Sequence, residues 1–135
     1  MRQFTALTLI GFLIGCTGSD PRSEALNTQS NTPLPAAIAC AGASYYADSL
    51  AGNATASGVP YEPNKLTAAH RTLPFGTRVR VVREGRGDVT VTINDRGPFI
   101  EGRIIDLSRA AAEKVDLIID GVADVCIYPA DEAGR

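Results

Sequence analysis

The sequence has 135 residues, a length that fits one small domain together with some non-domain sequence. Its 13 basic and 15 acidic side chains give a formal net charge of −2, which argues against nucleic-acid binding, because proteins that bind nucleic acids usually present a basic face. With one histidine and three cysteines, the chain lacks the residues for a zinc site of clustered His and Cys, and we predict no metal or other cofactor.

The first residues have the pattern of a bacterial lipoprotein signal. Arg2 precedes an apolar run at 4–14, which is too short to span a bilayer and fits the core of a signal peptide. The run ends in Leu-Ile-Gly-Cys at 13–16, which resembles the lipobox where such signals are cleaved and lipidated. We predict a lipoprotein signal peptide over 1–15 and lipid on Cys16. An ordinary secretory signal with a chance cysteine is the alternative.

The predicted arrangement is a domain tethered to a membrane. Residue 17 is Thr rather than Asp, which by resemblance to sorting in Gram-negative bacteria favours the outer membrane, facing the periplasm. Residues 16–39 are rich in Gly, Ser, Pro, Asn, Thr and Gln and have no periodic apolar face, which predicts a flexible linker after the lipidated cysteine.

The remaining cysteines form an even pair. Lipid on Cys16 would leave Cys40 and Cys126 in an oxidising compartment, at the first and last predicted strands of the domain. We predict a disulfide between them; two buried free thiols are the alternative. Closing so long a loop would stabilise the domain by roughly 4–5 kcal/mol at most.

Residues 40–129 are predicted to form a mainly β domain, followed by a tail at 130–135. Alternation and turn residues predict strands at 41–46, 77–83, 88–93, 103–107 and 123–128. Short helices are expected at 66–72 and 109–115. Ser108 is the expected N-cap of the second helix, and a hairpin at 84–87 should pair the two strands beside it. Many short strands favour a small closed barrel, because closure leaves no exposed edge.

Polar groups gather where the strand at 88–93 stops, in Asn-Asp-Arg-Gly-Pro-Phe at 94–99. Pro98 lacks an amide donor, so strand pairing is expected to end there. A carboxylate, a guanidinium and a carboxamide are thereby fixed at a strand end, where they could grip a glycan or a peptide, or move a proton. The alternative is a polar turn in which Asp95 caps backbone amides or pairs with Arg96.

Six short stretches stand in order along the domain. They are Ala-Ser-Tyr-Tyr at 43–46, Thr-Ala-Ser-Gly at 55–58, Leu-Thr-Ala-Ala-His at 66–70, Leu-Pro at 73–74 with Gly-Thr at 76–77, Asn-Asp-Arg-Gly-Pro-Phe at 94–99 and Arg-Ile-Ile-Asp-Leu-Ser at 103–108. Together they resemble the rare lipoprotein A (RlpA) family over about residues 41–128. The resemblance implies a six-stranded double-psi β-barrel and, as partner, the glycan strands of peptidoglycan. It also implies lytic transglycosylase activity.

The resemblance implies roles for individual residues. A lytic transglycosylase breaks the bond between N-acetylmuramic acid and N-acetylglucosamine without water, because the muramic 6-hydroxyl attacks its own C1 and leaves a 1,6-anhydro end. One carboxyl can give and take the protons in turn. Asp95 is the predicted carboxyl, and His70 is the second catalytic candidate, with a structural hydrogen bond as its alternative. Substrate binding is predicted for Tyr45, Tyr46, Asn94, Arg96 and Glu62; for the two tyrosines, packing against the barrel is the alternative.

The chain departs from the family pattern after Thr-Ala-Ser-Gly, where the family usually has a glutamate and this chain has Val59. A rearranged loop would bring in Glu62 instead; a solvated loop acid is the alternative. Since valine transfers no proton, a non-catalytic peptidoglycan-binding lipoprotein is the alternative function. The chain ends at Arg135, and we expect no C-terminal glycan-binding domain. Asp106, just before a helix start, is expected to cap or pair rather than catalyse.

Overall fold

The computed structural model describes residues 11, 15 and 35–130. Apart from Gly11 and Gly15, the predicted signal peptide lies outside the described residues, as do the predicted lipid site at Cys16, most of the linker and the tail after its first residue. None of the described helices is long and apolar enough to cross a bilayer.

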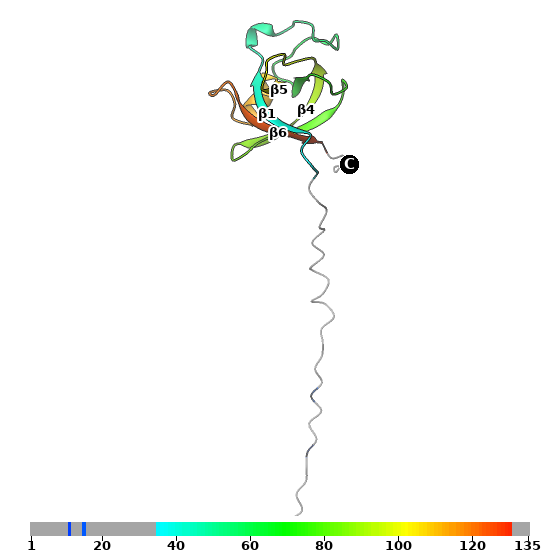
Figure 1. Ribbon diagram of the computed structural model, residues 1–135, viewed down its shortest axis with the longest axis vertical. Helices are drawn as coiled ribbons and strands as arrows, with labels where there is room; N and C mark the ends of the chain where they lie inside the picture. The colour runs from blue at the N-terminus through cyan, green and yellow to red at the C-terminus, as the bar shows by residue number, and fades with distance from the viewer. Residues whose placement is uncertain (1–10, 12–14, 16–34, 131–135) are drawn as a thin grey trace, which may run out of the picture. The chain divides into compact units, whose positions relative to one another are not determined.

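Six strands close into a barrel in the described part of the chain (Figure 1). They are β1 (Ala39–Tyr45), β2 (Thr67–His70), β3 (Arg78–Arg83), β4 (Gly87–Asp95), β5 (Arg103–Leu107) and β6 (Ala123–Pro129). The order around the barrel is β1-β5-β2-β4-β3-β6; β1 and β5 are parallel, as are β2 and β4, and the other neighbours are antiparallel. The predicted mainly β, closed, six-stranded architecture is confirmed.

Alternation along the strands decides which side chains form the core. Val89, Val91 and Ile93 of β4 are buried, while the residues between them are half-exposed. In β3, Val79 and Val81 are buried in the same way, next to exposed arginines. Fully burying one such side chain contributes about 1.5–3 kcal/mol relative to leaving it in water. The predicted hairpin pairs these two strands, so their buried faces join.

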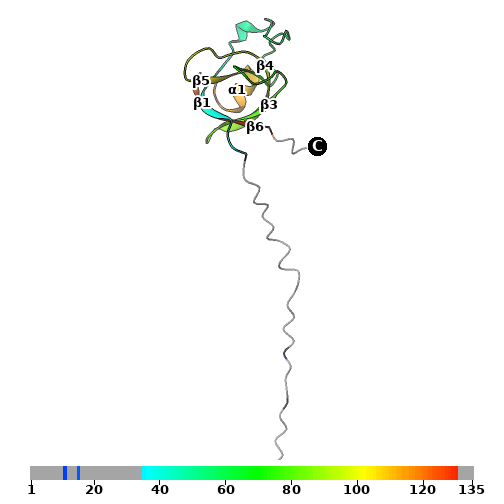
Figure 2. The same cartoon turned by 45° about the vertical axis from the view of Figure 1, so that its right-hand side comes forward.

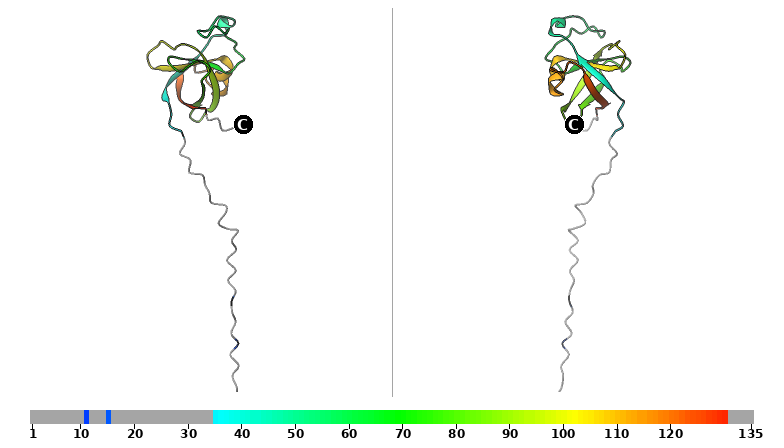
Figure 3. Two further views of the ribbon diagram at one scale, coloured as in Figure 1. Left: turned by 90° about the vertical axis from the view of Figure 1, so that its right-hand side faces the viewer. Right: turned by 60° about the vertical axis from the view of Figure 1, so that its left-hand side comes forward.

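The helix α1 (Arg109–Lys114) packs against β1, β4 and β5 (Figure 2, Figure 3). Its two central alanines are buried. Ser108 caps it as predicted, because the Ser108 hydroxyl accepts the N–H of Ala111 at 3.3 Å. A Cβ at Gly87 would lie 2.6 Å from the Lys114 carbonyl oxygen, at a φ of 138°. Glycine at this position therefore allows β4 to pass close to the end of the helix.

The prediction of a short helix at 66–72 is wrong, because Thr67–His70 forms β2 between β4 and β5. Ala68 and Ala69 are fully buried, so their small side chains suit a strand that is covered on both faces. Alanine favours a helix locally, but backbone pairing on both sides outweighs that propensity. The described residues thus contain one α-helix, α1, and a 3-10 turn, η1 (Asp48–Leu50).

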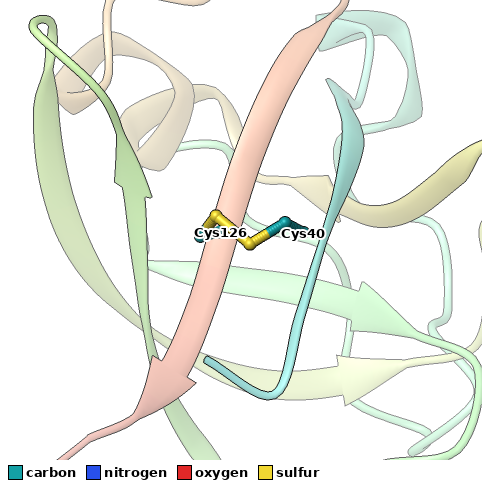
Figure 4. Close-up of a disulfide and its surroundings, with 2 residues drawn as sticks. All are labelled: Cys40 and Cys126. Carbon is teal, nitrogen blue, oxygen red and sulfur yellow. A yellow bond between two sulfur atoms is a disulfide. The ribbon is translucent and has the colours of Figure 1, made fainter. Parts of the chain in front are cut away.

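Cys40 of β1 and Cys126 of β6 form a disulfide (Figure 4), so the predicted pairing is confirmed. The two residues face each other in the antiparallel register, with their Cα atoms 4.1 Å apart. The bridge joins the first strand to the last strand, so the barrel is also closed covalently between β1 and β6.

Candidate functional site

One row of paired residues crosses four strands of the barrel. Ala69 of β2 pairs with Asp95, the last residue of β4, on one side and with Asp106 of β5 on the other. Asp106 pairs in turn with Ser44 of β1, whose hydroxyl donates to Asp106 Oδ1 at 2.5 Å. Both aspartates are only partly buried. The row therefore brings two carboxylates to the rim of the barrel, with one strand between them.

Three donors hold the Asp95 carboxylate. The Tyr46 hydroxyl donates to Oδ2 at 2.7 Å, and the backbone N–H groups of Ala56 and Arg96 each donate to Oδ1 at 2.8 Å. Three hydrogen bonds to one carboxyl group fix the orientation of the side chain. Asp95 accepts backbone amides, as a polar turn would require, but it also accepts a phenol from a residue 49 positions away.

Tyr46 is a fixed hydrogen-bond donor. Burial of its ring and, second, the hydrogen bond to Asp95 raise the pKa of Tyr46 far above the usual value of a phenol, so its hydroxyl stays protonated near neutral pH. Its ring centroid lies 4.9 Å from that of Tyr61, at a tilt of 52°, and Tyr61 is buried. These contacts keep the hydroxyl directed at the carboxylate.

His70 ends β2, one residue after the strand partner of Asp95. Its Nδ1 accepts the backbone N–H of Thr72 at 3.2 Å and that of Leu73 at 3.1 Å. Partial burial, followed by the charges of two neighbouring arginines, lowers the pKa of His70. The imidazole is therefore neutral at pH 7, with its proton on Nε2.

Arg96 braces the loop that follows β2. Its Nη1 donates to the carbonyl oxygens of Leu73 at 2.8 Å and His70 at 3.1 Å, and its guanidinium lies 4.0 Å from the ring centroid of Phe75. Within residues 35–130, no ion pair joins this guanidinium to the Asp95 carboxylate. The guanidinium predicted to bind substrate is thus engaged with backbone carbonyls.

Arg71, in the loop after β2, binds in turn to the loop that follows β4. Its Nε donates to the carbonyl oxygen of Pro98 at 2.5 Å, and its Nη2 donates to that of Ile100 at 2.9 Å. Each of these two arginines starts in one loop and binds carbonyls of the other, so the loops are held together. We call the two segments, 70–75 and 96–100, the braced rim.

The turn at 55–59 lies against the end of β4 and belongs to the long segment between β1 and β2, which projects beyond one end of the barrel (Figure 1). The Val59 carbonyl accepts the N–H and the hydroxyl of Thr55 at 3.0 and 2.6 Å, and the Ser57 N–H donates to the Asn94 carbonyl at 3.2 Å. Val59 is 50% exposed. Val59, at the position where the resemblance implied a glutamate, therefore lies in a turn that touches the candidate acid.

Two predicted substrate-binding residues lie outside this hydrogen-bonded group. The Tyr45 hydroxyl donates to the Ile118 carbonyl at 3.2 Å, and its ring packs against the core. Glu62 is an exposed loop residue paired with Lys65 at 2.9 Å. A hollow of about 680 Å³ lies elsewhere, beside the disulfide, and no candidate residue other than the two bridged cysteines lines it. Within residues 35–130, no group of three metal-ligating side chains occurs.

The barrel and its motifs match a known family of domains. The family described as "Lytic transglycolase" matches residues 38–127, which cover the barrel except for the last two residues of β6, and the chain belongs to this family. It is a family of double-psi β-barrels, so the fold implied by the sequence motifs is confirmed.

Relatives in three bacteria carry the same kind of name. "Probable endolytic peptidoglycan transglycosylase RlpA" of Treponema pallidum (strain Nichols) is 53% identical over 90 residues, which are 66% of this chain and 28% of that protein. Its namesake in Nostoc sp. is 56% identical over 89 residues, 63% of this chain and 24% of that protein. "Endolytic peptidoglycan transglycosylase RlpA" of Campylobacter jejuni is 48% identical over 84 residues, 62% of this chain and 30% of that protein. The resemblance to the rare lipoprotein A family is confirmed; the chain spans less than a third of these relatives' lengths.

Two solved structures share the fold. The Streptomyces papain inhibitor superposes with a TM-score of 0.54 at 25% identity, over 69% of this chain and 94% of the inhibitor. The apo expansin of Clavibacter michiganensis superposes with a TM-score of 0.56 at 20% identity, over 71% of this chain and 52% of the expansin. These similarities concern the barrel itself.

Proposed function

We propose that this barrel cuts the glycan strands of peptidoglycan by lytic transglycosylation. The observation that carries the proposal is the partly buried carboxyl group of Asp95, which three donors fix at the barrel rim. His70, one residue after the strand partner of Asp95, is neutral. The names of the relatives, endolytic peptidoglycan transglycosylases, support the same reaction and substrate.

In the proposed reaction, Asp95 in its protonated form gives its proton to the glycosidic oxygen while the bond from that oxygen to C1 of the muramic acid breaks. The oxygen of the muramic 6-hydroxyl bonds to the same C1, and the proton of that hydroxyl goes to Asp95. One bond breaks and one forms, no water is consumed, and the acid ends as it began. The products are a 1,6-anhydro end and a free N-acetylglucosamine end.

The neighbouring residues orient this exchange. Tyr46 acts through Asp95, since its hydroxyl fixes one carboxylate oxygen. The Nε2–H of His70 donates to an oxygen of the sugar, and Asn94 supplies a carboxamide for substrate binding. Arg96 is a positioning residue in this scheme, because its guanidinium is bound to the loop of the braced rim.

Digestion of purified sacculi, and of glycan strands stripped of stem peptides, tests the proposal. The full chain is incubated with each substrate, and the soluble products are identified by mass spectrometry. We expect muropeptides or glycan fragments with 1,6-anhydro ends. Products with hydrolysed, reducing muramic ends, or no products from either substrate, would contradict the proposed reaction.

A second candidate function is non-catalytic binding of peptidoglycan, and the turn at 55–59 is the observation that favours it. That turn touches Asp95 through Ala56 but carries Val59 in place of the family's usual glutamate. A wall-binding barrel would retain the rim and its hydrogen bonds without turnover.

We expect Val59→Glu to raise the rate of anhydro-product formation about tenfold or more, because an acid in this turn adds a proton-transfer group beside Asp95. Val59 is 50% exposed, so the charge is tolerated and the melting temperature stays within a few degrees of the wild type. Val59→Gln is the matched control, of equal size without an acid. Equal rates for the two variants would contradict this role; products from Val59→Glu but none from the wild type would favour the binding function.

The same proposal places the domain in the cell envelope, anchored in the outer membrane by lipid on Cys16 and held by the linker in the periplasm. We expect the full chain, expressed in a Gram-negative host, to incorporate labelled palmitate and to lose the label in Cys16→Ser. Thr17→Asp should keep the label and move the protein to the inner-membrane fraction. An unlabelled wild-type chain would contradict the anchor.

A further inference from the structure

Phe99, in the braced rim, is unusually exposed for a large aromatic residue. Phe99 is 81% exposed, and its neighbour Ile100 is 56% exposed. A single exposed apolar residue is ordinary on a protein surface, so exposure alone assigns no role. The surroundings of Phe99 are what distinguish it.

The backbone on both sides of Phe99 is fixed. Arg71 donates through Nε to the carbonyl of Pro98 and through Nη2 to that of Ile100, at 2.5 and 2.9 Å. These two bonds flank Phe99 and hold its loop in place before any ligand arrives. A loop whose backbone is already fixed loses less conformational freedom on binding, which favours a role in recognition.

The ring of Phe99 also lies against the backbone of its own loop. A Cβ at Gly97 would lie 3.7 Å from the Phe99 ring, so the ring lies against the backbone two residues after Asp95. The nearby ring of Phe75 is less available, because the Arg96 guanidinium lies 4.0 Å from its centroid. Phe99 therefore presents the freer aromatic surface of the braced rim.

We propose that Phe99 is a stacking platform for one sugar ring of the glycan strand, next to the sugar that Asp95 acts on. The proposal rests on the proposed function for its substrate class. The C–H faces of a pyranose are apolar and pack on the face of an aromatic ring. A phenylalanine brings no proton-transfer or hydrogen-bonding group, so Phe99 sets the position of the strand and takes no part in proton transfer.

Binding measured in the absence of cleavage tests the proposal. The full chain carrying Asp95→Asn is co-sedimented with purified sacculi over a range of concentrations, alone and combined with Phe99→Ala or Phe99→Tyr. We expect Phe99→Ala to weaken binding about tenfold, equivalent to about 1.4 kcal/mol. Phe99→Tyr, which keeps the ring, should bind within twofold of the parent.

Ile38→Ala is the matched control for losing an exposed apolar side chain. Ile38 is 44% exposed and lies before the start of β1, about 26 Å along the strand direction from Tyr46 at about 3.3 Å per residue. Binding of this variant should match the parent. Equal losses of binding affinity in Phe99→Ala and Ile38→Ala would overturn the proposal. A Phe99→Tyr variant that binds as weakly as Phe99→Ala would also overturn it. So would a Phe99→Ala variant with a changed oligomeric state and unchanged sacculus binding.

Failure of this inference is distinguishable from failure of the proposed function. Sacculus binding that depends on the Phe99 ring, with no anhydro products from the wild type, would support the stacking role of Phe99 and contradict the proposed reaction. Anhydro products from the wild type, with sacculus binding that does not depend on Phe99, would support the reaction and exclude the stacking role of Phe99. Melting curves of all variants show whether each one is folded.

Discussion

Asp95→Asn is expected to lower the release of 1,6-anhydro products from sacculi by about 10²–10⁴-fold, the range that a positioned general acid contributes. Asparagine has the same shape and retains an oxygen that can accept from Tyr46 or from the two backbone amides, so the rim should keep its structure. The loss would then come from the missing proton transfer. Product release is measured by mass spectrometry against time at fixed protein concentration.

Two further variants make this test specific. Asp88→Asn makes the same chemical change at the other end of β4, where the carboxylate is half-exposed and paired with Arg80, and it should leave the rate unchanged. Tyr46→Phe removes the donor to Asp95 and should cost about tenfold to a hundredfold, as expected for one hydrogen bond to a charged group. An active Asp95→Asn together with an inactive Asp106→Asn would assign the acid to the other carboxylate of the row.

Loss of the disulfide should produce the largest change in stability. Cys40 and Cys126 are 86 positions apart, so the bridge restricts the unfolded chain over nearly the whole barrel. We expect the double variant Cys40→Ser/Cys126→Ser to lower the free energy of unfolding by about 2–5 kcal/mol. A domain of this size is typically stable by about 5–15 kcal/mol, so the variant would be marginal near 37 °C. Urea titration monitored by circular dichroism measures this difference in the free energy of unfolding.

Reduction provides an independent check on the same bond. Dithiothreitol should destabilise the wild type by a similar amount and leave the double serine variant unchanged. Cys16→Ser removes the cysteine outside the disulfide and should not alter the unfolding free energy of the domain. A double variant as stable as the wild type would show that the pairing of β1 with β6 closes the barrel without covalent help.

The sequence contained the local features of the fold. The alternation in β3 and β4, the hairpin between them and the Ser108 cap all depend on neighbours within a few residues, so pattern and propensity predicted them correctly. The two cysteines were predicted to pair from their number and compartment, and the barrel register puts them opposite each other.

Long-range pairing decided what the sequence left open. Tyr45 and Tyr46 are adjacent and were treated alike, but one hydroxyl reaches the Ile118 carbonyl and the other reaches Asp95, because successive residues at a strand end point in opposite directions. Arg96 follows the candidate acid in the sequence, yet its guanidinium turns to the loop after β2, which offers backbone carbonyls.

By itself, then, the sequence determined a lipobox-like start, a β-rich domain closed by a cysteine pair, and the polar motif at the end of β4. Tertiary structure decided that Thr67–His70 is a strand, and only this strand aligns Asp95 with Asp106 across Ala69. The physical reason is that a central barrel strand is stabilised by hydrogen bonds to partners far away in the chain, which local helix propensity does not register.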